Sequence, residues 1–455
     1  MNTDPRETIA ASPMTPLQVL VVAITVALNA LDGFDVLSIS FASPGIAQEW
    51  GIDRAALGIV LSMELVGMAL GSILLGGVAD RIGRRPAILG CLVVMATGMI
   101  MATTVSGLVG LSIWRIVTGL GIGGMLAAIN AVAAEFSNAR RRHLSVSLMS
   151  IGYPLGAVFG GLVAARLLQG NNWRAVFYFG AAVTTLLIPI VYVFVPESVH
   201  WLARKQPADA LRMVNLTLTR MGHAAVTMLP EISADARRRT FTDIFAPGHV
   251  AGTVIVTLAY FLHITTFYFI VKWVPKIVVD LGFAASSAAG VLVWTNVGGA
   301  LGGAVLGLLT QRYSVKALTI GVLFASTVMV TLFGRTPADL QRLSLICGLA
   351  GFCINAGIVG LYAIIAQVFP THIRASGTGF AIGVGRGGSV FAPIIAGFLF
   401  AAGYSLPTVA FFLALGSLFG GVVLLFLKPE SDRPEVEHHD HRAMPAPIPA
   451  AGHAQ

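Results

Sequence analysis

The sequence predicts an all-α membrane protein whose twelve transmembrane helices form two pseudo-symmetric six-helix halves. The first observation is composition, since 56% of the 455 residues are hydrophobic and only 11% are charged. The second is that apolar runs about as long as a membrane-spanning helix, near 20 residues, recur along the chain. The third is an internal repeat. The 51 glycines suit close helix packing in a bilayer, whereas a β-barrel would show alternating polarity.

Turn residues or charges separate the twelve apolar runs. The runs are Leu17–Ala42, Ala55–Val78, Pro86–Val105, Leu108–Phe136, Ser145–Leu168, Ala175–Val195, Val250–Val274, Ala285–Leu309, Ala317–Phe333, Leu343–Phe369, Ser376–Ala402 and Pro407–Leu427. The first run is too long for a signal-peptide core and lacks a small-residue cleavage site, so we expect it to be retained.

A polar stretch divides the runs six and six. We therefore expect five segments: a cytoplasmic tail at 1–16, an N-terminal half at 17–195, a central cytoplasmic loop at 196–249, a C-terminal half at 250–428 and a disordered tail at 429–455. A short surface helix is expected around Pro207–Met221. The last segment contains three histidines near residue 440, but its Pro and Ala content favours an unfolded tail over a metal site.

The basic residues predict the topology. With the amino terminus inside, 20 of the 29 Lys and Arg fall in cytoplasmic segments and two, Arg115 and Arg386, within spans. The outer segments hold the other seven: Arg54, Arg166, Arg174, Lys272, Lys276, Arg335 and Arg342. This asymmetry indicates a multi-pass protein of a bacterial-type inner membrane with both termini in the cytoplasm. Because these charges flank apolar runs, they argue against a nucleic-acid partner.

The internal repeat relates the two halves. The run Gly76–Arg85, after the second span, has a degraded copy 231 residues later at Gly307, Gln311, Arg312 and Lys316. Pro196–Ser198 reappears as Pro429–Ser431. The pattern predicts two parallel six-helix halves with a cavity between them. The 231-residue offset also places Asp32 opposite His263.

Two carboxylates lie inside the first span. A carboxylate in the hydrocarbon core costs roughly 2.5 to 3.5 kcal/mol, so Asp32 and Asp35 need a function there. Their spacing of three residues puts both on one helix face. Gly33, between them, permits close approach of another helix or a ligand. The alternative is that Asp32 only caps a break in the helix.

These motifs carry a family resemblance that covers Leu17–Glu430. The run Gly76–Arg85 resembles the loop signature of the major facilitator superfamily, and Arg115–Gly119 and Pro196–Leu202 resemble further motifs of it. The stretch Asp32–Asp35 resembles the signature of the aromatic acid:proton symporters, the 4-hydroxybenzoate, benzoate and gallate type. The resemblance implies the major facilitator fold and supports functional weight for six residues: Asp32, Asp35, Arg115, Glu135, Arg374 and Arg386.

Arg115 is the expected partner of the two acids. At a rise of about 1.5 Å per residue, Asp35 lies roughly 27 Å from the inner end of its span and Arg115 about 10 Å from the outer end, so their depths are compatible. Either the pair is static, or it breaks when Asp32 or Asp35 takes a proton, which is the interpretation we favour.

Arg386 is the candidate carboxylate ligand. It lies about 15 Å from the inner end of the eleventh span, and its planar guanidinium can bind a carboxylate through two hydrogen bonds. A structural bond across the halves is the alternative. Two other groups are expected at mid-membrane: His263 as a proton relay or a neutral hydrogen-bonded imidazole, and Glu64 as a relay or a structural partner.

The charged loop after the second span suggests a gate on the inner face. Asp80 can bind helix ends and arginines of the other half when the carrier faces outward, and Gln311 replaces it in the second copy. The expected gating residues are Gly76, Asp80, Arg81, Gly83, Arg84, Arg85, Glu135, Arg312 and Arg374.

An aromatic substrate also needs ring contacts and hydroxyl partners. The candidate aromatic residues are Phe34, Tyr153, Tyr260, Phe267, Tyr268, Trp294 and Tyr362, and the candidate amides are Asn130, Asn296 and Asn355. Gly152–Gly156 is similar to the glycine-proline motif of exporting relatives, but Pro154 precedes Gly156 by two residues, and this departure weakens an exporter interpretation.

We therefore expect a monomeric carrier that imports an aromatic carboxylate with protons by alternating access. A sugar or drug carrier of the same fold, and a membrane sensor that signals through the central loop, are the alternatives. No nucleophile with a base and no metal-ligand cluster is evident at membrane depth, so neither an enzyme nor a cofactor is expected. The three cysteines, Cys91, Cys347 and Cys353, lie in apolar runs and suggest buried small side chains rather than a disulfide framework.

Overall fold

The computed structural model describes residues 4–75, 77–170, 172–230, 244–246, 248–370 and 373–427. Its helices in the first part of the chain are α1 (Pro5–Ala11), α2 (Pro16–Trp50), α3 (Arg54–Leu74), α4 (Val78–Ile82), α5 (Arg84–Ala102), α6 (Leu108–Glu135), α7 (Arg142–Leu167), the 3-10 turn η1 (Leu168–Gly170), α8 (Arg174–Phe194), α9 (Val199–Lys205) and α10 (Ala210–Arg220). The remaining helices are α11 (Val250–Asp280), α12 (Ala285–Leu309), α13 (Val315–Arg335), α14 (Leu340–Val368), α15 (Arg374–Gly385), α16 (Gly387–Ala401) and α17 (Leu406–Leu425).

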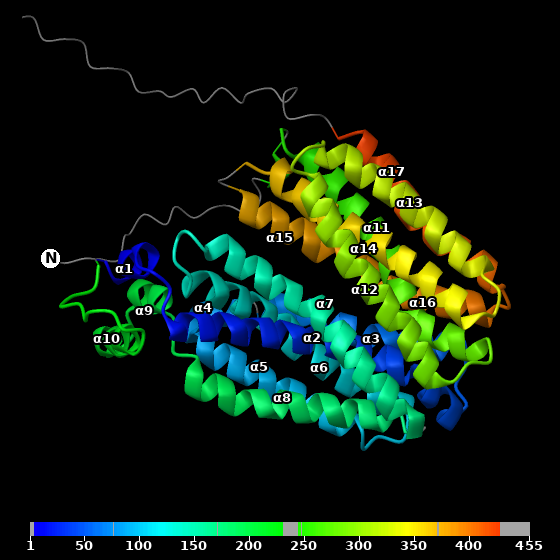
Figure 1. Cartoon of the computed structure of the whole chain (residues 1–455), viewed down its shortest axis with the longest axis horizontal. Coiled ribbons are helices and arrows are strands. Elements are labelled where there is room, and N and C mark those ends of the chain that lie inside the picture. The colour runs from blue at the N-terminus through cyan, green and yellow to red at the C-terminus, as the bar shows by residue number, and fades with distance from the viewer. Residues whose placement is uncertain are drawn as a thin grey trace, which may run out of the picture.

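Within the described residues, twelve helical stretches are long and apolar enough to cross a membrane, which confirms the predicted fold class. They form two bundles that lie side by side, α2 to α8 and α11 to α17 (Figure 1). The short helices α1, α9 and α10 gather at one end of the first bundle. We call this end the terminal side and the other end, where α2 ends and α3 begins, the opposite side.

The two bundles repeat the same helix pairs. In the first half α3 packs on α6, α5 on α8 and α2 on α8, and in the second half the equivalent pairs are α12 on α14, α13 on α17 and α11 on α17. The contacts between the halves are also related by the repeat, since α3 packs on α16 and α7 on α12. The structure is therefore pseudo-symmetric, as the repeat in the sequence predicts.

Glycines allow the backbones of the paired helices to lie in direct contact. A Cβ at Gly67 would lie 2.2 Å from the carbonyl oxygen of Ile116, and one at Gly119 would lie 2.1 Å from that of Glu64. The second half repeats this contact, because a Cβ at Gly302 would lie 2.0 Å from the carbonyl oxygen of Phe352. Small residues thus bring α3 against α6 and α12 against α14 with no side chain between them.

Several predicted boundaries change. The segment expected as an N-terminal tail contains α1, and α2 runs to Trp50 because Pro44 does not end it. The eleventh span is interrupted at Arg386, between α15 and α16. The helix expected around Pro207–Met221 is confirmed as α10. The predictions for Gly76 and for the tail 429–455 lie outside the described residues.

Polar contacts between the halves gather on the opposite side. Arg54, the first residue of α3, forms a 2.9 Å ion pair with Asp280, the last residue of α11. Two turns further along α3, the Ser62 hydroxyl donates a 2.7 Å hydrogen bond to the carbonyl of Val390 in α16. These bonds join the two bundles at the end of the molecule away from α1, α9 and α10.

Candidate transport site

Asp32 and Asp35 lie in the uninterrupted middle of α2 and are buried. The capping alternative for Asp32 is therefore wrong, because no helix end occurs there. None of their four carboxylate oxygens has a hydrogen-bond partner among the described residues. Gly33, between them, lets α7 approach, since a Cβ there would lie 2.0 Å from the carbonyl oxygen of Tyr153. The two carboxylates are thus placed by helix packing and left without a bonded partner.

Arg115 does not form its ion pair with Asp32 or Asp35, and the expected pairing is wrong for this structure. Its guanidinium pairs with Glu64 of α3, and both side chains are 0% exposed. The packing of α6 against α3 through Gly119 brings these two residues together. The bond of Arg115 to Asp35 is to the backbone: the guanidinium donates a 3.0 Å hydrogen bond to the carbonyl oxygen of Asp35. The carboxylate of Asp35 is within electrostatic range of Arg115.

Lys272 is a second buried cation beside Glu64. We counted it among the outer-loop residues, but α11 continues to Asp280 and encloses Lys272 at 0% exposure. Its ammonium lies 3.5 Å from the Glu64 carboxylate and donates to the carbonyl oxygen of Val36. The sequence could have indicated this burial, because Lys272 falls inside the predicted apolar run Val250–Val274.

Arg386 occupies the interruption between α15 and α16 and is half-buried. Its charge interacts with three tyrosines of the same half, namely Tyr260, Tyr268 and Tyr362. The hydroxyls of Tyr260 and Tyr362 lie 3.2 Å apart. Arg386 also interacts electrostatically with Asp32 of the other half. The structure therefore brings the candidate anion ligand and one of the paired acids to the same cross-half region.

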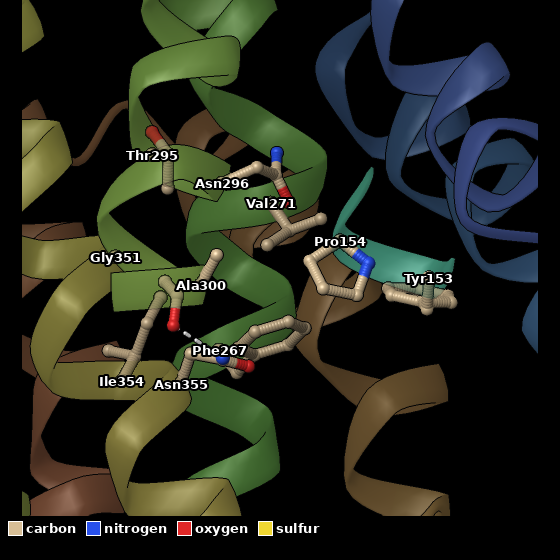
Figure 2. Close-up of a pocket in the computed structure, with 11 residues that line it drawn as sticks. Tyr153, Pro154, Phe267, Val271, Thr295, Asn296, Ala300, Gly351, Ile354 and Asn355 are labelled. Carbon is tan, nitrogen blue, oxygen red and sulfur yellow. Dashed lines mark hydrogen bonds between the residues drawn. The ribbon is translucent and has the colours of Figure 1, made fainter. Parts of the chain in front are cut away.

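A pocket opens beside this region. It is lined by Tyr153 and Pro154 of α7 together with residues of α11, α12 and α14. Figure 2 shows Tyr153 and Pro154 facing Phe267, Asn296 and Asn355 across it. The Asn355 side chain donates a 2.6 Å hydrogen bond to the carbonyl of Gly299, which fixes its orientation. Apolar walls with a few oriented polar groups are typical of small-ligand pockets.

A separate network of charges lies on the terminal side. Arg84 forms ion pairs with Glu135 at 2.9 Å and with Asp80 at 2.7 Å, and Asp80 also pairs with Arg204 at 3.1 Å. The backbone N–H of Arg84 donates a 2.8 Å hydrogen bond to Glu197. These residues tie α4, α5, α6 and the start of the central loop into one unit.

The family model described as Major Facilitator Superfamily matches residues 25–348 and 256–452. The chain belongs to the major facilitator superfamily. Its twelve candidate spans and this membership identify it as a multi-pass protein of the bacterial inner membrane.

Several curated relatives of this facilitator carry transport names. It is 29% identical over 391 residues to a 4-hydroxybenzoate transporter of Pseudomonas putida, which covers 85% of this chain and 87% of the relative. It is 27% identical to a gallate transporter of the same species, over 93% of this chain and 94% of the relative. It is also 27% identical to a benzoate transport protein of Acinetobacter baylyi, over 91% and 90%.

Solved structures share the fold of this facilitator. A D-xylose-proton symporter superposes with a TM-score of 0.70 at 18% identity, over 91% of this chain and 98% of that one. The inward open conformation of a xylose transporter from E. coli gives a TM-score of 0.71 at 16% identity, over 90% and 96%.

Among the predicted site residues that do not line the pocket of this facilitator are Phe34, Trp294 and His263. Phe34 packs inside the first half, edge-on to Phe179 with ring centroids 5.2 Å apart. Trp294 is 57% exposed and does not line the pocket. Both ring nitrogens of His263 are bonded within the second half, to the Ser417 hydroxyl and the Ile354 carbonyl at 2.8 Å each. Because a carbonyl only accepts, Nε2 carries a proton.

The remaining gating residues of this facilitator divide into two groups. Gly83 adopts a φ of 108° next to Glu197, and Arg85 lies over the Tyr192 ring, so both belong to the terminal-side network. Arg81, Arg312 and Arg374 are exposed, and Arg374 donates a 3.2 Å hydrogen bond to the nearby carbonyl of Phe369. The expected contact of Asp80 with the other half belongs to an outward-facing state and stays a prediction.

Proposed function

We propose that this facilitator imports an aromatic carboxylate together with protons by alternating access. One observation carries the proposal: Asp32, one of two buried acids, lies within electrostatic range of Arg386 across the interface of the halves, and three tyrosines are within electrostatic range of the same guanidinium. A proton site and an anion site that face each other are what coupled transport of a proton and an anion requires.

The curated relatives support the substrate class. Proteins named as transporters of 4-hydroxybenzoate, gallate and benzoate match this chain over most of its length. These three acids share an aromatic ring and a carboxylate. The substrate would place its carboxylate on Arg386 and its ring in the adjoining pocket, against Tyr153 and Phe267. Asn296 and Asn355 would then face the ring substituents.

The paired acids would carry the transported proton. Neither carboxylate has a bonded counter-ion, and an ionised carboxylate so placed is costly. Protonation of Asp32 neutralises the acid nearest Arg386 and leaves this guanidinium free for the incoming anion. The substrate carboxylate then replaces the aspartate as its partner, and release inward follows the exit of the proton.

The basic residues support an orientation with the terminal side in the cytoplasm. In that orientation Arg54–Asp280 and Ser62–Val390 would close the outer face, which supports an inward-facing state. The contacts by which Asp80 would close the inner face form in the other state. One chain contains both halves and the whole site, which fits action as a monomer.

Uptake by cells that express the protein tests the proposal. Labelled benzoate, hydroxybenzoates, protocatechuate, gallate and gentisate are supplied with and without a protonophore, and xylose serves as the control substrate. We expect saturable uptake of one or more aromatic acids that collapses with the proton gradient. Uptake that ignores the protonophore would contradict proton coupling, and transport of xylose alone would overturn the substrate class.

A further inference from the structure

We propose that Lys272 is a latch between the halves: its ammonium binds Glu64 and the Val36 carbonyl when the opposite side is closed, and leaves them each time that side opens. The inference rests on the alternating-access part of the proposed function and is independent of which solute is carried. No sequence motif noted above includes Lys272.

The geometry sets Lys272 apart from the other charges. It belongs to α11 of the second half, whereas Glu64 in α3 and Val36 in α2 belong to the first. Its ammonium therefore makes polar contacts with two helices of the opposite bundle at once. Arg115, the other partner of Glu64, lies in α6 of the same half as Glu64.

Arg115 and Lys272, the two cations that pair with Glu64, therefore respond differently when the halves move apart. Helices α3 and α6 touch backbone to backbone, so Arg115 and Glu64 stay together when the bundles move apart. Lys272 must separate from Glu64 in the same motion, because its own helix moves with the second half. Of the two cations that bind Glu64, Lys272 is therefore the one that loses this partner when the halves separate.

Burial makes the loss of this contact more costly than the loss of the ion pair at the rim. Lys272 and Glu64 are both 0% exposed, whereas Arg54 and Asp280 are 44% and 27% exposed. Solvent screens an exposed pair and reduces its contribution, while a buried cation without a counter-ion is strongly unfavourable. Opening must therefore hydrate Lys272 or supply it with another anion.

Lys272 also binds the backbone of α2 next to Asp35, one of the two paired acids. Lys272 donates to the carbonyl of Val36, and Arg115 donates to the carbonyl of Asp35, so adjacent carbonyls of α2 each receive a cation. Lys272 thus positions the segment that carries the two acids against the second half. It is a positioning residue, since it does not touch the proposed substrate pocket.

Cysteine labelling measures the latch directly. Ser62→Cys places a thiol at the buried contact between α3 and α16, which opening of the opposite side exposes. A membrane-impermeant maleimide is added to intact cells, and the rate is compared with and without Lys272→Gln. We expect the rate at position 62 to rise about tenfold as the population shifts toward the open state. Lys276→Gln, one turn along α11, is the matched control: it removes a cation that pairs with Asp280 of the same helix and leaves the Arg54–Asp280 pair between the halves in place, so it should change the rate much less.

Two further measurements separate a latch from a loss of stability. The buried thiol of Cys347 lies inside the second half, so it should stay unreactive in Lys272→Gln, whereas general unfolding would expose it. Lys272→Met, which needs no hydrogen-bond partner, should reproduce the faster labelling. Unchanged labelling at position 62 in both variants would overturn the latch, as would equal acceleration at Cys347. Because the assay contains no substrate, neither result depends on the uptake experiment.

Discussion

Glu64 and Arg115 form a solvent-free ion pair between α3 and α6, and this pair leaves the carboxylates of Asp32 and Asp35 without a bonded cation. The arginine that the sequence offers to the paired acids is thus already neutralised. What remains for Asp32 is the charge of Arg386 in the other half. The following predictions examine this division of partners.

Replacing each paired acid with asparagine tests its role in proton coupling while keeping the shape of the side chain. Asp32→Asn and Asp35→Asn keep the size of each side chain and remove its titration. We expect proton-driven accumulation to fall at least about tenfold in each variant, since the proton site is lost. Counterflow exchange of substrate, which needs no net proton movement, should be retained better than accumulation. Normal accumulation by both variants would exclude these acids as the proton carriers.

Arg386 should control affinity for the carboxylate. Arg386→Gln removes the charge, and Arg386→Lys keeps it without the planar pair of donors. We expect the uptake KM to rise about 10- to 100-fold in the first and less in the second, because hydrogen bonds to charged groups contribute about 1.5 to 3 kcal/mol. Arg335→Gln, at the far end of α13, is the control. A KM unchanged by Arg386→Gln would support the structural alternative for this residue.

The tyrosine hydroxyls beside Arg386 should contribute less than its charge. Tyr260→Phe and Tyr362→Phe each keep a ring and remove one end of the 3.2 Å hydroxyl contact. We expect each to raise the KM severalfold, in line with about 1 kcal/mol for a neutral hydrogen bond. Tyr313→Phe, which alters an exposed tyrosine after α12, should leave the KM unchanged. A loss as large as that of Arg386→Gln would mean that the tyrosines, rather than the guanidinium, bind the substrate.

Gly33 should be required for the close packing of α2 against α7. In Gly33→Ala the new Cβ would lie 2.0 Å from the carbonyl oxygen of Tyr153, so α2 and α7 must move apart. Overpacking of this kind costs about 1 to 3 kcal/mol, and we expect a lower Tm in detergent. Gly90→Ala, where a Cβ meets nothing within 4 Å, should keep or slightly raise the Tm. Equal Tm values for the two variants would contradict the close helix contact.

Glu197 should make the terminal-side network sensitive to pH. Burial raises the pKa of its carboxyl above 4.5, and this outweighs the N–H groups of Ser198, Arg84 and Arg85 that lower it. A raised pKa in the folded state means that its contribution is greatest below pH 4.5 and is lost as pH rises through the folded value. Glu197→Gln should therefore flatten the fall in Tm between pH 4.5 and 7, and an unchanged slope would contradict this assignment.

Much of the fold could be predicted because a membrane requires long apolar helices, and these are visible one by one along the chain. The repeat that relates Gly76–Arg85 to its second copy also follows from sequence alone. The ends of the helices could not be predicted as closely. A charged residue such as Lys272 can lie within a transmembrane helix when the neighbouring bundle buries it.

The partners of buried charges could not be derived in the same way. Helix counting gives the depth of Arg115 but not the direction in which its helix faces, and that direction depends on the contact of Gly119 with α3. Trp294 shows the same limit, since composition identifies an aromatic residue but does not say whether it lines a pocket or the outer surface.

The charges at the core of the described transmembrane helices balance. Asp32, Asp35 and Glu64 supply three negative charges when ionised, and Arg115, Lys272 and Arg386 supply three positive ones. One bound carboxylate would add a net negative charge to this interior, and one proton would cancel it. If this chain imports a monoanion with protons as proposed, one proton for each monoanion would keep the loaded site neutral, and the crossing step would then respond weakly to the membrane potential.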